Sequence, residues 1–280
     1  MPGIRCFRAT DPETGHLVGT QVASSQIPAL LTFVALTFVW TWTLWMAGAG
    51  LASYAPALGK ILFLLAGFGP SLSGLMTVWI FDGRAGLGRW LLRCLNWRLR
   101  PIWYAVAFLG PPLAMILAVG IDAALGGALA SSPSAGHVCL AVVQFMLILI
   151  INGPLGEEFG WRGYALYPLT ARLGWRWAGL IVGSVWGLWH LPLFFIPGMA
   201  QAQMPIALFM TSALALSVLM ARMAVNTKFS VLPALTFHWS INAWPGFIPI
   251  IPSDGNVRPY VLVMGVLLVV ASIVLATPRS

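Results

Sequence analysis

Charged side chains are scarce in this chain. Lys, Arg, Asp and Glu make up 8% of its 280 residues, hydrophobic residues make up 59%, and only seven residues are acidic. Soluble domains carry about 25% charged residues, so the composition excludes an ordinary soluble protein. Cysteine is scarce too. Cys6, Cys94 and Cys139 have no CxxC or metal-type spacing, which argues against a disulfide framework or a cysteine-ligated metal centre.

Long apolar runs fill most of the chain instead. A helix of about 20 apolar residues crosses the roughly 30 Å hydrocarbon layer of a bilayer, and the continuous runs disfavour the alternating strands of a membrane barrel. The predicted fold class is therefore an all-α, polytopic membrane bundle, a single domain over residues 27–276 after an N-terminal segment, residues 1–26. About eight transmembrane helices are expected: residues 27–48, 61–81, 102–125, 138–158, 177–197, 204–224, 231–250 and 259–276.

The basic residues give this bundle an orientation. The net charge is +8, and all but two of the fifteen Lys and Arg residues fall on one side of the predicted topology. The two exceptions are Lys60 and Arg258. Because Lys and Arg are enriched in cytoplasmic connections, both termini are expected in the cytoplasm, and the positive charge is explained without a nucleic-acid partner.

The connection at 82–101 and the Gly- and Pro-containing segments indicate further features. Five arginines alternate with Leu and Trp over 82–101, which predicts a basic amphipathic helix in the headgroup region, either a linker or a docking surface for substrate or lipid. Gly and Pro residues at 67–70, 110–112 and 153–154 predict kinks around a cavity.

Two glutamates at the end of the apolar run 138–151 are the most informative residues. An ionised carboxylate in such a run is costly unless it is paired or solvated. Glu158 stands four residues before Arg162, the spacing of a helical ion pair, so it is the expected structural carboxylate. Glu157 is then the freer one and suited to accept a proton from water. The alternative is that both glutamates only cap the span at the interface.

Two later spans carry further polar groups. His190 is the only ionisable residue of an aromatic-rich span, where an expensive group indicates function. His238 and Asn242 are four residues apart and therefore share one helix face. They offer either a metal ligand with an orienting amide or two donors for an oxyanion, unless Asn242 only joins helices. The 14 Trp residues are typical of interfacial belts and packing. Three of them flank the polar groups and are candidates to wall the entrance of the site: Trp161, Trp186 and Trp189.

Three motifs occur in order, each on its own predicted span. They are Glu157-Glu158-x-x-x-Arg162, Trp186-x-x-x-His190 and His238-x-x-x-Asn242. Together they resemble the CPBP family of intramembrane proteases, which includes CAAX prenyl endopeptidases and bacteriocin-processing or immunity proteins. The first position of the second motif is more often Phe than Trp, so Trp186 is a mild departure.

The resemblance implies a peptidase whose catalytic residues are Glu157, His190, His238 and Asn242. Glu157 and His190 would activate a water, and His238 and Asn242 would stabilise the oxyanion. Glu158, Arg162 and Trp186 would support them. Glu157, His190 and His238 also form a three-residue zinc ligand set with a fourth position for water, so a metalloendopeptidase is expected, with a metal-free mechanism as the alternative.

The same resemblance implies a membrane-associated peptide substrate, prenylated or not, cut in a bacterial inner membrane by a site that opens toward the cytoplasm. Two other function classes stay open. One is a non-catalytic membrane protein that binds a bacteriocin or another partner and confers immunity. The other is a proton-coupled transporter, which is disfavoured because the connections 126–137 and 198–203 contain no acidic or basic residue apart from His137.

Overall fold

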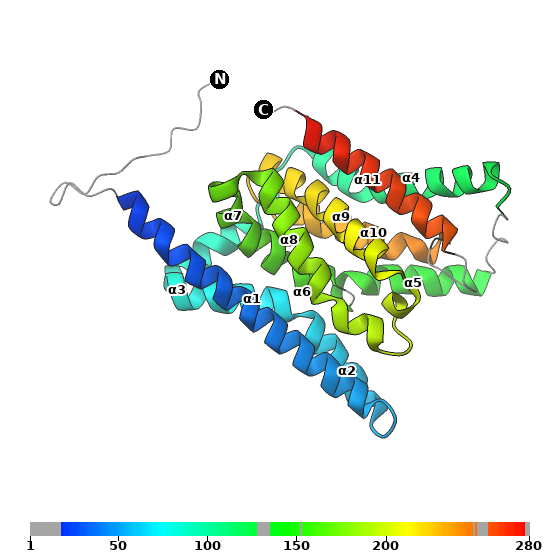
Figure 1. Cartoon of the computed structure of the whole chain (residues 1–280), viewed down its shortest axis with the longest axis horizontal. Coiled ribbons are helices and arrows are strands. Elements are labelled where there is room, and N and C mark those ends of the chain that lie inside the picture. The colour runs from blue at the N-terminus through cyan, green and yellow to red at the C-terminus, as the bar shows by residue number, and fades with distance from the viewer. Residues whose placement is uncertain (1–17, 128–134, 152, 249, 251–256, 278–280) are drawn as a thin grey trace.

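The chain folds into a bundle of helices (Figure 1). The computed structural model describes residues 18–127, 135–151, 153–248, 250 and 257–277, and over these residues it contains no β-strand. The all-α, polytopic fold class is therefore confirmed. Residues 1–17 of the predicted N-terminal segment lie outside the described residues, as does Asn152 at the start of the glutamate stretch.

The elements differ widely in length. The longer helices are α1 (Val18–Leu51), α3 (Gly69–Cys94), α4 (Pro101–Ala124), α5 (Ala135–Ile151), α8 (Trp175–Trp189), α9 (Ile206–Asn226) and α11 (Arg258–Ala276). Between them lie α2 (Pro56–Gly67), α6 (Pro154–Glu158), the π-helix η1 (Phe159–Ala165), α7 (Leu166–Leu173), α10 (Leu232–Ala243), and the 3₁₀ turns η2 (Leu191–Phe195), η3 (Ala200–Gln203) and η4 (Trp244–Gly246).

The number of full crossings is smaller than predicted. In the described part of the chain six stretches are long and apolar enough to span a bilayer, or seven when α2 and α3 are counted as one bent span. These two helices meet at an angle of 50°. The predicted crossing at 231–250 is not a full one, because α10 has 12 residues. At 1.5 Å per residue such a helix is about 18 Å long, well short of the hydrocarbon thickness.

The helix that carries the glutamates continues past them. α5, α6, η1 and α7 follow one another, and the apolar stretch Val138–Leu173 is 36 residues long. Gly153 interrupts it with φ 102°, a conformation that favours glycine, and Pro154 then starts α6, where a missing N–H costs nothing. Glu157 and Glu158 therefore lie inside this stretch, and both side chains are buried, with exposed fractions of 4% and 0%.

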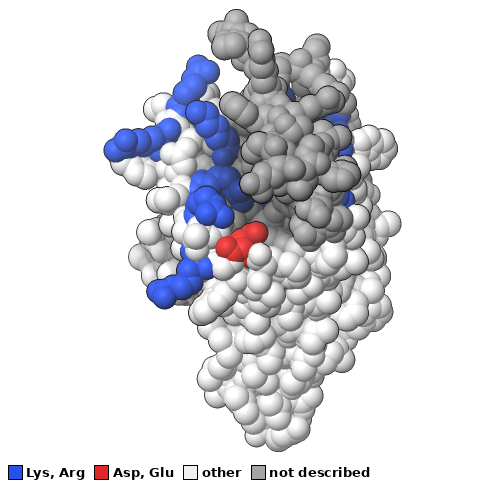
Figure 2. Space-filling model, turned by 90° about the vertical axis from the view of Figure 1, so that its left-hand side faces the viewer, with Lys and Arg blue, Asp and Glu red and all other residues white. Residues whose placement is uncertain are grey.

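Basic side chains gather on one face of the molecule (Figure 2). We call this end of the bundle the basic face. Its basic residues lie in α3 and at or near the ends of α7, α8 and α9: Arg84, Arg89, Arg93, Arg172, Arg176, Arg222 and Lys228. The opposite face carries Lys60 and Arg258, and Arg258 pairs with Asp122 at 2.8 Å. Arg162, which the topology counts among the basic residues of the cytoplasmic side, is buried with an exposed fraction of 1%.

The predicted amphipathic segment at 82–101 is part of this basic face. α3 is broken at Gly83 (φ 64°) and continues as a helix only to Cys94. The segment also packs against η1. Trp90 Nε1 and Arg93 Nη2 both donate to the carbonyl of Gly163, at 3.0 and 2.8 Å. The connection therefore buttresses the helix that follows the glutamates.

Candidate active site

Glu158 is the centre of the polar network. Its Oε1 lies 2.8 Å from Nη1 of Arg162, so the ion pair predicted from the four-residue spacing is present. Glu158 is 0% and Arg162 1% exposed, and the pair therefore neutralises two charges that would be costly alone in a membrane interior. Arg162 also lies over the ring of Trp186, with Cζ 4.6 Å from the ring centroid.

His238 shares the same carboxylate. Its Nδ1 lies 2.7 Å from Oε1 of Glu158, a contact between α10 and α6 that the sequence analysis did not predict. A carboxylate accepts, so Nδ1 carries the proton of this bond and Nε2 is left for other partners. A carboxylate behind an imidazole fixes the tautomer and the orientation of the ring. Glu158 is thus a positioning residue for His238 as well as the partner of Arg162.

Glu157 turns to the other side of α6 and meets α8. Trp186 Nε1 donates to Oε2 of Glu157 at 2.5 Å. The other oxygen, Oε1, approaches Gly153 together with Nε2 of His238: a Cβ built on Gly153 would lie 2.6 Å from the first atom and 3.2 Å from the second. Gly153 therefore leaves the space in which these two polar atoms face one another. The sequence predicted a kink at Gly153 but not this approach of two polar atoms.

His190 is placed by the end of α8. It follows Trp189, the last residue of the helix, and its Nδ1 lies 2.8 Å from the carbonyl oxygen of Trp186. A carbonyl can only accept, so Nδ1 of His190 donates and its Nε2 is available as an acceptor when the ring is neutral. The two histidines thus have different partners behind them, a carboxylate for His238 and a neutral carbonyl for His190.

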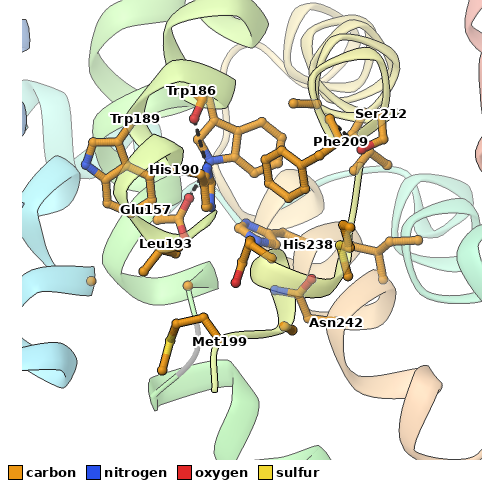
Figure 3. A pocket seen from close by; sticks show the side chains of 18 of the residues that line it. Glu157, Trp186, Trp189, His190, Leu193, Met199, Phe209, Ser212, His238 and Asn242 are labelled. Atoms are coloured by element: carbon orange, nitrogen blue, oxygen red, sulfur yellow. Dashed lines mark hydrogen bonds between the residues drawn. The ribbon is translucent and has the colours of Figure 1, made fainter. Parts of the chain in front are cut away.

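These side chains line one cavity of about 560 Å³ (Figure 3). Glu157, His190, His238 and Asn242 all border it, so the structure brings the four predicted catalytic residues together from α6, α8 and α10. Asn242 stands one turn beyond His238 on α10. Glu157, His190 and His238 are all at least nine-tenths buried, which gives a polar cluster in a largely water-excluded site.

Aromatic side chains enclose this cluster. Trp186 and Trp189 border the cavity as predicted, together with Trp45 of α1 and Phe209 of α9, which the sequence analysis did not single out. The ring centroid of Phe209 lies 5.1 Å from that of His190. Trp161 does not border the cavity. It packs behind Trp189, with ring centroids 6.2 Å apart, so its predicted place in the wall was wrong.

The polar cluster does not form a ready metal site. Among the described residues no group of three or more His, Cys, Asp or Glu side chains is placed to hold a metal ion. Glu157, His190 and His238, the ligands expected from the sequence, line one cavity without converging as such a group. In their hydrogen bonds Glu157 uses Oε2 and each histidine uses Nδ1, so these bonds do not engage Oε1 of Glu157 or Nε2 of either histidine.

A polytopic helical bundle with two buried carboxylates, two histidines and an amide around an internal cavity has the parts of an intramembrane peptidase. Residues 139–244 match the model of the Rce1-like family, described as type II CAAX prenyl endopeptidase. The chain is also similar to CAAX prenyl protease 2 of Methanococcus maripaludis, with 27% identity over 227 residues, which cover 74% of this chain and 80% of that protein. Both similarities support a protease of the CPBP family.

Proposed function

We propose that this protein hydrolyses a peptide bond of a membrane-associated substrate with a water molecule activated by Glu157. One observation supports this most directly: Oε1 of Glu157 and Nε2 of His238 face the same point beside Gly153, at the wall of the cavity. A base and a potential donor on either side of one small space are what the addition of water to a carbonyl requires.

In the proposed reaction Glu157 takes a proton from the water. The water oxygen then attacks the peptide carbonyl carbon, while Nε2 of neutral His190 accepts the second hydrogen of the water and orients it. Trp186 holds the Glu157 carboxylate through its indole N–H, which keeps Oε1 turned to the cavity. A general base placed in this way contributes roughly 10²–10⁴-fold to rate.

Hydrogen-bond donors are needed to stabilise the negative charge that develops on the carbonyl oxygen. In the proposed reaction His238 supplies one from Nε2–H, while Glu158 holds the ring through Nδ1–H. The amide of Asn242, one turn further along α10, supplies a second. Glu157 then returns its proton to the leaving amine as the C–N bond breaks, so the products are a carboxylic acid and an amine and no proton is lost.

The substrate proposed is a peptide held at the bilayer. Apolar residues dominate the cavity wall, and Leu193, Met199, Met204 and Phe209 are among them. The relative from M. maripaludis is named for prenylated CAAX substrates, and a prenylated peptide is therefore the first candidate here. A non-prenylated membrane-anchored peptide is the second, and processing of a bacteriocin would fall in that group.

The test uses purified protein in liposomes with fluorogenic peptides that carry either a farnesyl group or a transmembrane anchor. Wild type is expected to cut at least one of them, and Glu157→Gln should lose roughly 10²–10⁴-fold of that activity. Unchanged cleavage by Glu157→Gln would exclude Glu157 as the base. Binding of the peptide without any cleavage by wild type would instead favour the non-catalytic, partner-binding function.

A further inference from the structure

A second cavity lies between α4, α9, α10 and α11. It has a volume of about 380 Å³, within the range of about 300–1,000 Å³ that is typical of small-ligand sites. α10 contributes Phe237 to this groove and the next residue, His238, to the active-site cavity. No residue of the described chain borders both cavities, so the groove is a separate site.

The groove follows the seam between α4 and α11, which lie side by side (Figure 1). On α4 its lining extends from Trp103 to Leu117, a rise of about 21 Å at 1.5 Å per residue. One leaflet of the hydrocarbon layer is about 15 Å thick, half of the roughly 30 Å of the whole layer. The length of the groove is therefore closer to that of a lipid chain in one leaflet than to a full crossing.

The two ends of the groove differ in chemistry. Beyond Leu117 the seam is closed by an ion pair, in which Nε of Arg258 lies 2.8 Å from Oδ1 of Asp122. At the other end the lining reaches Arg222 of α9 and Val274 near the end of α11. Arg222 is the single charged residue among the described residues that line the groove. The groove is thus an apolar slot with a cation at one end.

A second guanidinium group lies near the same end. Cζ of Arg222 is 5.3 Å and Cζ of Arg176 is 4.9 Å from the ring centroid of Trp175, so both charges stack on one indole. Nε of Arg176 also donates to the carbonyl of Leu275 at 2.8 Å, which fastens it to the last turn of α11. Both arginines are partly exposed. Basic pockets between membrane helices are complementary to anionic lipid headgroups.

The middle of the groove has room for a chain. Gly110 lines it on α4, and a Cβ built on Gly110 meets no atom within 4 Å. Apolar side chains that face an empty space forfeit their dispersion contacts on that side. In a bilayer an acyl chain can supply these contacts along the whole length of the slot.

We propose that this groove binds one acyl chain of an anionic membrane lipid, with the headgroup at Arg222 and Arg176 and the chain running along α4 toward Leu117. The bound chain packs against Phe237 and so supports the helix that carries His238. The same helix is tied to α4 by Ser240, whose Oγ donates to the carbonyl of Phe108 at 2.7 Å. The lipid site goes beyond the proposed function, because binding at this groove requires no cleavage.

Binding is measured on the purified full-length protein in detergent by native mass spectrometry. The probes are phosphatidylglycerol, which is anionic, and phosphatidylcholine, which is zwitterionic, with identical acyl chains. Wild type should bind phosphatidylglycerol more tightly, and Arg222→Gln should lower that affinity about fivefold, the effect of one basic residue on an anionic lipid. Arg222→Lys should retain it. Arg89→Gln removes an exposed arginine elsewhere on the basic face and should leave the affinity unchanged.

Gly110→Leu tests the slot itself. Its side chain occupies the space of the acyl chain, so the saturable binding of the first lipid molecule should be lost for both lipids. Phosphatidylglycerol should also raise the melting temperature of wild type more than phosphatidylcholine does, and this difference should vanish in Gly110→Leu. Gly120→Leu is the matched control, since a Cβ at Gly120 also meets open space on α4 but Gly120 does not line the groove.

Equal affinities of wild type for the two lipids, or an unchanged affinity in Arg222→Gln, would overturn the proposal. Saturable binding that persists in folded Gly110→Leu would place the lipid elsewhere and overturn it as well. Displacement of phosphatidylglycerol by a farnesylated peptide, but not by the same peptide without the farnesyl group, would assign the groove to the substrate instead. The comparison of Arg222→Gln with Arg222→Lys decides the matter even if Gly110→Leu does not fold.

Discussion

His238 and Glu158 are joined by a hydrogen bond of 2.7 Å, although 80 residues separate them in the chain. The same oxygen of Glu158 binds Arg162, so one buried carboxylate orders both the helix that follows it and the ring that faces the cavity. The two adjacent glutamates therefore have different roles. Glu158 builds the site and Glu157 borders it.

Replacing His238 by Asn or by Gln should distinguish the roles of the two ring nitrogens. The amide nitrogen of Asn stands near the position of Nδ1 and can still donate to Glu158, whereas that of Gln reaches toward Nε2. His238→Asn is therefore expected to fold with near wild-type thermal stability and to lose cleavage, because nothing replaces the donor in the cavity. His238→Gln should keep more cleavage and be less stable. The reverse order in melting temperature and rate would contradict this assignment.

The two glutamates should respond differently to neutralisation. Glu158→Gln leaves the charge of Arg162 buried without a partner, and Arg162→Gln does the same to the charge of Glu158. Removing one partner of a buried ion pair lowers the free energy of unfolding by about 3–5 kcal/mol. Both variants should show lower folded yield and lower melting temperature in detergent. Glu157→Gln keeps an acceptor for Trp186 and should retain normal yield without cleavage. Equal losses of yield for Glu157→Gln and Glu158→Gln would speak against distinct roles.

Trp186→Phe tests the indole hydrogen bond by itself. Phenylalanine keeps an aromatic ring beneath Arg162 but has no N–H for Glu157, and a hydrogen bond to a charged group contributes about 1.5–3 kcal/mol. We expect a folded protein whose kcat falls roughly ten- to a hundredfold, the equivalent of about 1.4–2.8 kcal/mol, with little change in KM. Trp189→Phe is the matched control, since the Trp189 indole does not contact Glu157. An unchanged kcat would show that the bond does not position the base.

Metal dependence decides between the two mechanisms left open by the sequence. Because the proposed mechanism uses Glu157 itself as the base, we expect protein with less than about a tenth of an equivalent of transition metal to keep its activity in the presence of a chelator. Elemental analysis and cleavage assays on the same preparation measure this. About one equivalent of zinc that is lost in His190→Ala, with activity restored by added zinc, would show that Glu157, His190 and His238 close around a metal after all.

Reporter fusions check the orientation of the whole bundle. A reporter that is active only in the cytoplasm should give signal after Arg98 and at Ser280, and none near Ser132. The reason is that most Lys and Arg residues fall on the side that contains Arg98 and Ser280, and such residues are enriched on the cytoplasmic side. The complementary reporter, active only outside the cytoplasm, should give the opposite pattern and controls for poor expression. Signal from the cytoplasmic reporter near Ser132 alone would invert the topology.

Local sequence patterns were sufficient for several features. Long apolar runs predicted the helical membrane bundle, since the hydrocarbon layer leaves a spanning chain few other structures. The spacing of four residues predicted the pair between Glu158 and Arg162, because that interaction depends only on helix geometry. The scarcity of ionisable groups in apolar runs singled out Glu157, His190 and His238, since each is costly in a bilayer unless it has a use.

Contacts between elements far apart in the chain could not be predicted from the sequence and became visible only in the tertiary structure. The bond from His238 to Glu158 and the bond from Trp186 to Glu157 join different helices, and their geometry depends on how α6, α8 and α10 pack. The length of one helix was also misjudged: α10 has only 12 residues, and it packs against α4 and α5. Hydropathy and charge determine that this chain crosses the membrane, whereas only the packing of its helices decides which groups meet there.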